Sequence, residues 1–173
     1  MSLHTEEVHF VAFDPGGTTG WAHFIVHADA FATPDTTILD HIEYWNCGEF
    51  QGSLHERAAL ACGLIQQTRS RSERTQPTPR AVYVVSESFD LTQRMGGAEL
   101  LEPIQLNAII GYFCATQGFH FTEQARQLRR SVTKERLALW GFQGPFRKDE
   151  FAAMQHALRY IRSRGAARAT MWE

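Results

Sequence analysis

The stretch Phe13-Asp14-Pro15-Gly16-Gly17-Thr18-Thr19-Gly20-Trp21 decides the fold of this chain. The segment before it, Val8 to Phe13, is apolar apart from His9, which predicts a buried strand. Proline and glycine then predict a tight turn, after which Trp21 to Val26 resumes as a second strand. The stretch therefore predicts a strand–turn–strand hairpin with Asp14 at the mouth of the turn.

The rest of the chain alternates between helical and extended patterns. Further strands are predicted at Thr36 to Phe50, Ala81 to Ser86 and Phe119 to Thr122. Helices are predicted at Ser53 to Thr68, Ala98 to Gln117, Thr133 to Trp140 and Lys148 to Arg162, with a loop over 70–80 and a frayed end over 165–173. Three antiparallel strands followed by two strands that alternate with helices predict an α/β fold, a mixed five-stranded sheet flanked by helices, in one domain over 1–173.

Composition limits the functions that this chain can have. Its 173 residues suit one domain, and 43% apolar residues are enough for a core. No apolar run approaches the ~20 residues of a membrane span, and the first residues have no signal-peptide pattern. Three scattered cysteines, Cys47, Cys62 and Cys114, support neither a disulfide framework nor a zinc motif. We therefore expect a cytoplasmic protein with no membrane contact.

Basic residues are concentrated in the last third of the chain. The net charge is only −2, but eleven basic residues, nearly all arginine, lie between Gln124 and Arg168 against three acidic ones. The planar guanidinium group suits phosphate recognition, so this distribution favours local contact with nucleic acid. A solvated helical surface would have the same composition.

Two carboxylates follow predicted central strands. Asp14 ends the first strand, and Glu87 ends the strand Val84-Val85-Ser86. If the strands are neighbours, the two carboxylates approach each other and repel unless a cation lies between them. Each has a simpler interpretation: Asp14 as a cap of the Asp-Pro-Gly turn, and Glu87 as a strand-end residue that faces water.

The last predicted helix contributes further polar residues. In Lys148-Asp149-Glu150-Phe151-Ala152-Ala153-Met154-Gln155-His156 the helical period aligns Asp149, Ala152, Ala153 and His156 on one face. Small residues between two polar ones suit close packing on a sheet. The alternatives are an Asp149 that interacts with the helix dipole and a His156 in the core or on the surface.

Taken together, these elements resemble the RuvC-type Holliday-junction resolvases, particularly the divergent versions of bacteriophages and their hosts. The resemblance rests on the Asp-Pro-Gly-Gly-Thr-Thr-Gly-Trp-Ala hairpin, on Glu87, on the helix pattern Asp-x-x-Ala-Ala-x-x-His-Ala-Leu and on the segment 131–141. It implies an RNase H-like fold, a homodimer and a site for two Mg²⁺ or Mn²⁺ ions. By position, Asp14, Glu87 and Asp149 match three of the family's four ligands.

The fourth ligand position departs from the family pattern. Ala152 stands where the resemblance implies an aspartate, either as a natural variation for which His156 compensates one turn later or as a substitution that disables the enzyme. His156 would favour Mn²⁺, or would orient or protonate the attacking water. The site residues that we expect are Asp14, Glu87, Asp149 and His156.

Contacts to branched DNA are expected around this site. The candidates for phosphate contacts are Arg126, Arg129, Arg130, Lys134, Arg147 and Lys148. Phe89 is a candidate for stacking on bases at a branch point, or a core residue. The apolar helix Ala98 to Gln117, with Leu100, Leu101, Ile104, Ile109 and Phe113, is the candidate dimer contact.

Four functions remain open on the sequence. The first is a metal-dependent endonuclease that resolves four-way or other branched DNA. The second is an RNase H-fold nuclease on RNA–DNA hybrids or plain DNA, and the third is a junction-binding protein that does not cleave. The fourth, a sugar-kinase or actin-like ATPase, is disfavoured because the chain is too short for a second domain. A Walker-type nucleotide site is also disfavoured, because no Gly-Lys-Ser/Thr follows the glycines.

Overall fold

A computed structural model describes residues 7–28, 38–75, 82–89 and 98–169. Its strands are β1 (Glu7–Asp14), β2 (Thr19–His27), β3 (Ile42–Phe50), β4 (Val82–Ser88) and β5 (His120–Ala125). Its α-helices are α1 (Leu54–Thr75), α2 (Ala98–Gln117), α3 (Lys134–Leu139) and α4 (Lys148–Ala169), and the 3-10 helices η2 (Ile38–His41) and η3 (Arg126–Ser131) complete it. No helix in the described part of the chain is long and apolar enough to cross a membrane.

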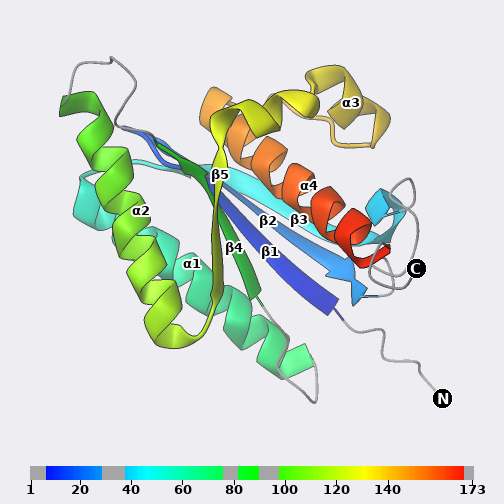
Figure 1. The fold of residues 1–173 in the computed structure, drawn as a ribbon, viewed down its shortest axis with the longest axis horizontal. Coiled ribbons are helices and arrows are strands. Elements are labelled where there is room, and N and C mark those ends of the chain that lie inside the picture. Colours follow the sequence, from blue (N-terminus) through cyan, green and yellow to red (C-terminus); the bar gives the residue numbers. More distant parts are fainter. Residues whose placement is uncertain (1–6, 29–37, 76–81, 90–97, 170–173) are drawn as a thin grey trace.

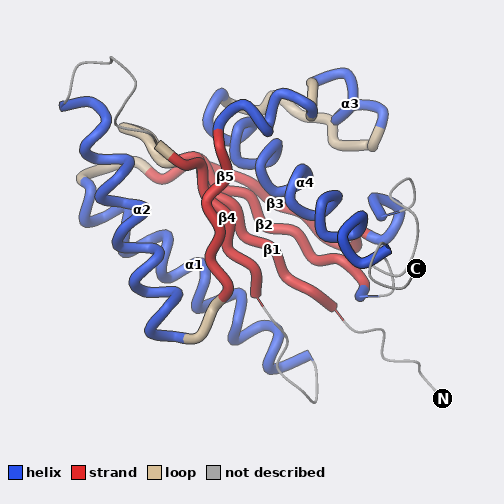
Figure 2. Tube along the Cα trace, viewed as in Figure 1, coloured by secondary structure: helices blue, strands red, loops and turns tan. Residues whose placement is uncertain are grey.

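The five strands form one mixed sheet, as the sequence predicts, and their order is β3-β2-β1-β4-β5 (Figure 2). The pairs β1–β2 and β2–β3 are antiparallel, and Asp14 lies opposite Gly20, which lies opposite Glu49. The pairs β1–β4 and β4–β5 are parallel, and Phe13 lies beside Ser86. The carboxyl ends of β1, β4 and β5 therefore meet at one end of the sheet.

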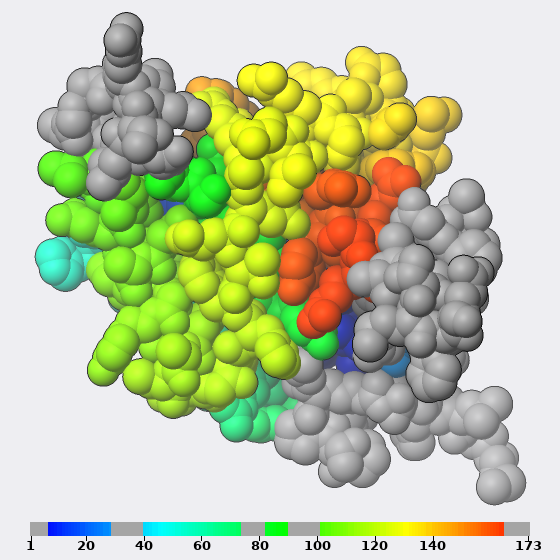
Figure 3. Space-filling model, in the orientation of Figure 1, coloured from blue at the N-terminus to red at the C-terminus, as the bar shows by residue number. Residues whose placement is uncertain are grey.

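Helices cover both faces of the sheet, with α1 and α2 on one side and α4 on the other (Figure 1). Alternation along β1 explains the two layers, because Phe10 and Ala12 pack under α4 while Val11 and Phe13 pack under α1 and α2. Figure 3 shows the outer surface on which β5, η3 and α3, in yellow, lie beside α4, in orange and red.

Helix α1 begins as predicted but ends later. The Ser53 backbone N–H donates to Oε2 of Glu56 at 2.8 Å, and Glu56 N–H donates back to Oγ of Ser53 at 3.4 Å, which is a capping box. The predicted end at Thr68 and the loop from residue 70 are wrong, because the helix continues to Thr75. Ser72 is buried, and Arg71 lies over the ring of Tyr44, so packing holds this turn in helix despite its weak propensity.

Two other predictions also need correction. The first part of the predicted strand 36–50 is the 3-10 helix η2, and residues 36 and 37 lie outside the described residues. Helix α4 continues past the predicted end at Arg162 to Ala169, where a frayed end was expected from residue 165. Arg164 packs over the rings of Tyr83 and Tyr160, 4.0 and 5.6 Å from their centroids, which ties this end of α4 to the sheet.

The three cysteines lie in chemically quiet surroundings. Cys47, Cys62 and Cys114 are all free thiols, as predicted from their spacing. Burial raises the pKa of each, to about 11 for Cys47 and to about 12 for Cys114. A thiol with a raised pKa is a poor nucleophile and a poor metal ligand at neutral pH, so the cysteines contribute no chemistry.

Candidate active site

The predicted carboxylate pair is assembled at the end of the sheet. Asp14 ends β1, and Glu87 lies near the end of the parallel neighbour β4. The Glu87 side chain is 3% exposed and that of Asp14 is 14% exposed. Water therefore solvates these two charges poorly, and other groups of the protein must compensate them.

The pKa values show how the two carboxyl groups share this environment. Burial and the charge of Glu87 raise the pKa of Asp14 to about 7, against the opposing effect of Arg129. Burial also acts to raise the pKa of Glu87, but a hydrogen bond from His156 and the charge of Arg129 outweigh it and lower that pKa. At neutral pH Glu87 is therefore the fully charged member of the pair, and Asp14 retains a proton part of the time.

His156 is neither a surface residue nor part of the apolar core. Its imidazole is fully buried, with Nε2 3.0 Å from Oε2 of Glu87 and Nδ1 3.1 Å from Oε1 of Gln124. The helical face predicted from the sequence therefore turns toward the carboxylates. His156 fixes the orientation of Glu87, and Gln124 in turn fixes the ring.

Asp149 lies near the carboxylate pair without touching it. It is the second residue of α4, and its charge contributes to the raised pKa of Asp14. Burial and the charge of Glu49 raise the pKa of Asp149 itself. Among the described residues, no group of three or more His, Cys, Asp and Glu side chains is arranged to hold one metal ion. Asp14 and Glu87, which both lie close to Nη1 of Arg129, are therefore the candidate ligands.

Ala152 lies on the same face of α4, between Asp149 and His156. It is 3% exposed, although it belongs to neither of the two apolar core clusters. A side chain at this position is thus directed toward the polar face that carries His156. An alanine there offers no ligand, so among Asp149, Ala152 and His156 only the first and the last carry a polar side chain on this face.

Two arginines of η3 also lie close to the carboxylates. Nη1 of Arg129 is 2.7 Å from Oε2 of Glu87 and 3.3 Å from Oδ1 of Asp14. Nε of Arg126 is 3.7 Å from Oε1 of Glu87, and the Arg126 side chain is 60% exposed. Both were predicted to contact phosphate. In the structure Arg129 pairs with both acidic residues and Arg126 reaches Glu87 and solvent, and their contact with phosphate stays a prediction.

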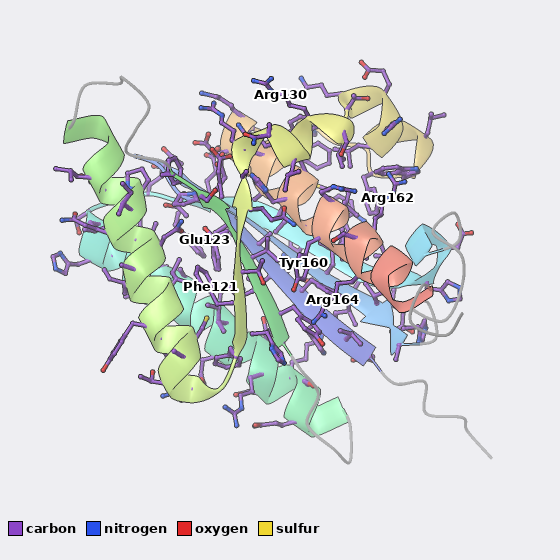
Figure 4. The ribbon with its side chains drawn as sticks, in the orientation of Figure 1. Phe121, Glu123, Arg130, Tyr160, Arg162 and Arg164 are labelled. Atoms are coloured by element: carbon purple, nitrogen blue, oxygen red, sulfur yellow. The ribbon has the colours of Figure 1, made fainter. Side chains whose placement is uncertain are left out.

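The other predicted DNA contacts surround this group. Arg130 projects from η3 at the end of the sheet where the carboxylates lie, whereas Arg164 and Tyr160 lie further along α4 (Figure 4). Lys148 is exposed at the start of α4, and the exposed Arg147 pairs with Glu49 at 3.0 Å. The remaining two candidates are Lys134, which lies over the ring of Phe151, and Phe89, which is half-buried just beyond β4 and outside both core clusters.

Residues from the opposite face of the sheet also hold Glu87, and the sequence analysis missed them. Asn107 of α2 is buried, and its Nδ2 donates to the backbone oxygen of Glu87 at 2.7 Å and to Oε1 of Glu123 at 3.0 Å. Oγ of Ser86 donates to Oδ1 of Asn107 at 2.6 Å. The available signal was Asn107 within the run Leu106 to Ile110, whose other residues are apolar, because a buried polar group needs partners.

The arrangement of these elements matches solved structures. The structure of Thermus thermophilus RuvC aligns with a TM-score of 0.52 and 16% identity, over 91% of this chain and 96% of that one. T. thermophilus RuvC in complex with a Holliday junction substrate aligns with a TM-score of 0.53 and 14% identity, over 91% and 95%. The chain has the RuvC-like fold.

This result confirms the predicted RNase H-like architecture of the RuvC kind, with its mixed sheet between helices. The yeast mitochondrial Holliday junction resolvase Ydc2 also aligns, with a TM-score of 0.49 and 11% identity over 94% of this chain and 80% of that one. No protein family model and no curated protein sequence matches the chain. At these identities the likeness to RuvC concerns the fold, and the function must be argued from the residues.

Proposed function

We propose that this protein is a divalent-metal-dependent endonuclease that cuts four-way or other branched DNA. One observation carries the proposal: Asp14 and Glu87 meet at the ends of two parallel strands, both poorly solvated and within reach of one cationic atom. A fold that gathers two carboxylates in this way incurs an electrostatic cost, which a bound cation would offset. The match to a RuvC structure solved with a Holliday junction supports branched DNA as the substrate class.

The residues present fit a hard divalent cation in part. Carboxylate oxygens are the ligands that Mg²⁺ prefers, and Asp14 and Glu87 supply them from rigid strands. Asp14 and Glu87 would hold the metal, with Asp149 as a further carboxylate toward it. A divalent cation bound there would supply an activated water and stabilise the charge of the leaving 3′ oxygen.

The chain's own residues would perform the remaining tasks. Arg126, Arg130 and Lys148 expose their charges near the carboxylates and would bind the phosphates that flank the cut. His156 is a positioning residue that keeps Oε2 of Glu87 directed at the site. Phe89, half-buried beside Glu87, would stack on a base at the branch point.

Cleavage assays with a set of labelled substrates test this function. A four-way junction, a linear duplex and an RNA–DNA hybrid are incubated with the protein in Mg²⁺ or Mn²⁺. We expect metal-dependent cuts in the junction and little cutting of the linear duplex. Equal cutting of both DNA substrates would refute selectivity for branched DNA, and preferential cutting of the hybrid would favour the RNase H-type activity.

Asp14→Asn tests the site itself. The variant loses a charged ligand, so cleavage should fall at least about 100-fold while junction binding is kept or strengthened by reduced repulsion of phosphate. Asp40→Asn is the matched control, because Asp40 is exposed on η2 at the opposite end of the sheet. Intact cleavage by the Asp14 variant would contradict the assignment.

A second function is favoured by Ala152 alone. A protein with one ligand position filled by a buried alanine would bind junctions and not cleave them. Metal-dependent cleavage by the natural chain excludes this alternative. Junction binding without cleavage in either metal would favour it.

The surface of α2 suits the homodimer that the family resemblance implies. Leu101, Ile109 and Tyr112 are 51%, 36% and 74% exposed, and their spacing places them along one side of the helix. Phe113, which was expected in this contact, packs instead against Phe119 and the core. A dimer formed through this side of α2 would bring two copies of the active site to one junction.

A further inference from the structure

Arg129 contacts both carboxyl groups of the site through one atom. We propose that Arg129 is an internal counter-cation, which compensates Asp14 and Glu87 while no metal is bound and is displaced by a divalent cation to contact the DNA phosphate. The inference rests on the proposed function, because it assumes that this carboxylate pair holds the metal. It assigns Arg129 a role different from the surface arginines around it.

The contacts of Nη1 carry the first step of the argument. This single atom is 2.7 Å from Oε2 of Glu87 and 3.3 Å from Oδ1 of Asp14, and the Arg129 side chain is only 14% exposed. Although Nη1 is buried, it makes no hydrogen bond of good geometry to either oxygen. It therefore acts on the pair as one positive charge that both carboxyl groups share. A divalent cation that shares both oxygens would occupy the same position.

Electrostatics make the two occupants mutually exclusive. A cation bound by both carboxylates would lie within a few ångström of the guanidinium, and like charges at that distance repel strongly in a poorly solvated site. Arg129 must therefore leave when the cation binds. The protein then exchanges one ion pair for another, and the apparent metal affinity is lowered by the cost of displacing Arg129.

The setting of η3 allows this displacement without unfolding. Val132 N–H donates to the Arg129 oxygen at 2.9 Å, and Gln155 of α4 donates to the Val132 oxygen at 2.5 Å, so the end of η3 is fixed on α4. The same segment exposes two further arginines. These are Arg126, three residues before Arg129, and Arg130, which follows it. A change of side-chain rotamer would bring the Arg129 guanidinium to that basic surface, where a DNA phosphate would receive it.

Metal binding in the absence of DNA tests the exchange. Isothermal titration with Mn²⁺ alone would compare the natural protein with Arg129→Gln and with Arg130→Gln, which removes the same charge from the exposed neighbour. We expect Arg129→Gln to bind Mn²⁺ about tenfold more tightly or better, since the competing cation is gone, and Arg130→Gln to change the affinity much less. Mn²⁺ binding by Arg129→Gln that is equal to or weaker than that of the natural protein would overturn the proposal. So would the absence of Mn²⁺ binding in both the natural protein and Arg129→Gln.

Thermal unfolding with a chelator provides a second readout. Arg129→Gln removes the one cation that contacts both carboxyl groups, so its unfolding midpoint should fall below that of the natural protein and recover when Mn²⁺ is added. Arg129→Lys keeps a positive charge and guards against a glutamine variant that fails to fold. It should restore part of the metal-free stability, and a lysine variant as unstable as the glutamine variant would count against the counter-cation role.

The last step, transfer to phosphate, is tested with a four-way junction in Ca²⁺ or in chelator. The natural protein should bind the junction more tightly in Ca²⁺ than in chelator. For Arg129→Gln this increase in affinity should be about tenfold smaller. An undiminished gain would overturn the transfer. If junction cleavage fails while the Mn²⁺ results hold, the proposed function fails and the exchange stands. If cleavage occurs while Arg129→Gln binds Mn²⁺ no better, the exchange alone fails.

Discussion

Gly20 of β2 lies directly against the backbone of Asp149 at the start of α4. A Cβ atom added to Gly20 would come within 2.0 Å of the Asp149 carbonyl oxygen and 2.2 Å of its carbon. Gly20 is also the strand partner of Asp14. The missing side chain therefore lets α4 approach the sheet beside the first carboxylate, and this is how Asp149 comes close enough to influence Asp14.

Gly20→Ala should accordingly displace the start of α4. The clash is with backbone atoms, which cannot rotate away, so we expect a loss of about 2 kcal/mol or more in the free energy of unfolding. Gly17→Ala is the control, because a Cβ atom there meets nothing within 4 Å. Denaturant unfolding should place that control within about 0.5 kcal/mol of the natural protein. Similar stability of both variants would argue against the close approach of α4.

Ala152→Asp tests whether position 152 belongs to the metal site. The position is buried, so a new carboxylate should cost about 2 to 5 kcal/mol in the metal-free protein. If the new oxygen reaches the cation held by Asp14, Mn²⁺ should recover most of that loss and strengthen cleavage. Thermal unfolding with and without Mn²⁺ measures both parts. Destabilisation that metal does not relieve would show that the side chain points away from the site.

His156→Ala removes the group that holds Glu87. Glu87 and Gln124 would each lose a buried hydrogen-bond partner, for a cost of about 2 to 3 kcal/mol. Mn²⁺ affinity should fall as well, because Glu87 would no longer be fixed in orientation. His55→Ala, on the exposed surface of α1, serves as the control. Unfolding and titration data that do not distinguish the two variants would reduce His156 to a packing residue.

The sequence was most informative about functional side chains whose position follows from the end of a strand or the face of a helix. Asp14 and Glu87 could be placed together because each follows a strongly apolar strand, and parallel neighbours end at the same edge. His156 could be aligned with Asp149 because helical spacing fixes which residues share a face. These features depend on local patterns and on the order of the elements, and both can be read along a single chain.

The contacts of Arg129 and Gln124 depend on tertiary placement and could not be predicted in this way. Arg129 lies on a six-residue 3-10 helix, and nothing in its local sequence separates it from Arg130 next to it. Gln124 became a partner of His156 only because β5 pairs in parallel with β4, which puts Gln124 beside Glu87. The late end of α1 was missed for the same reason, since the burial of Ser72 outweighs its local preference.

The exposed side of α2 leads to a prediction about assembly. Introducing a charge at Leu101 or Tyr112, as Leu101→Asp or Tyr112→Asp, should weaken self-association at least about tenfold, since neither side chain is needed for the core. Leu139→Asp is the matched control, because Leu139 is 83% exposed on α3, away from α2. Sedimentation velocity over a range of concentrations measures the effect. A natural protein that is monomeric throughout would contradict the proposed dimer, and loss of the dimer only in Leu139→Asp would move it to α3.

The raised pKa of Asp14 predicts a pH dependence of the metal-free protein. In the unfolded chain this carboxyl group titrates near about 3.9, whereas burial and Glu87 raise the folded value to about 7. The folded state thus binds the proton more tightly. The contribution of Asp14 to stability is complete below about pH 4 and is lost as the pH rises through about 7.

Asp14→Asn removes this titration. The unfolding midpoint of the variant, measured in chelator, should therefore rise relative to the natural protein between about pH 5 and about pH 8. Asp40→Asn controls for the loss of one carboxylate as such, because Asp40 is exposed on η2. If the unfolding midpoint of Asp14→Asn relative to the natural protein is constant or falls over this range, Asp14 is already charged at a lower pH. In that case Arg129, 3.3 Å from Asp14, would lower the pKa of this carboxyl group enough to offset the effects of burial and of Glu87.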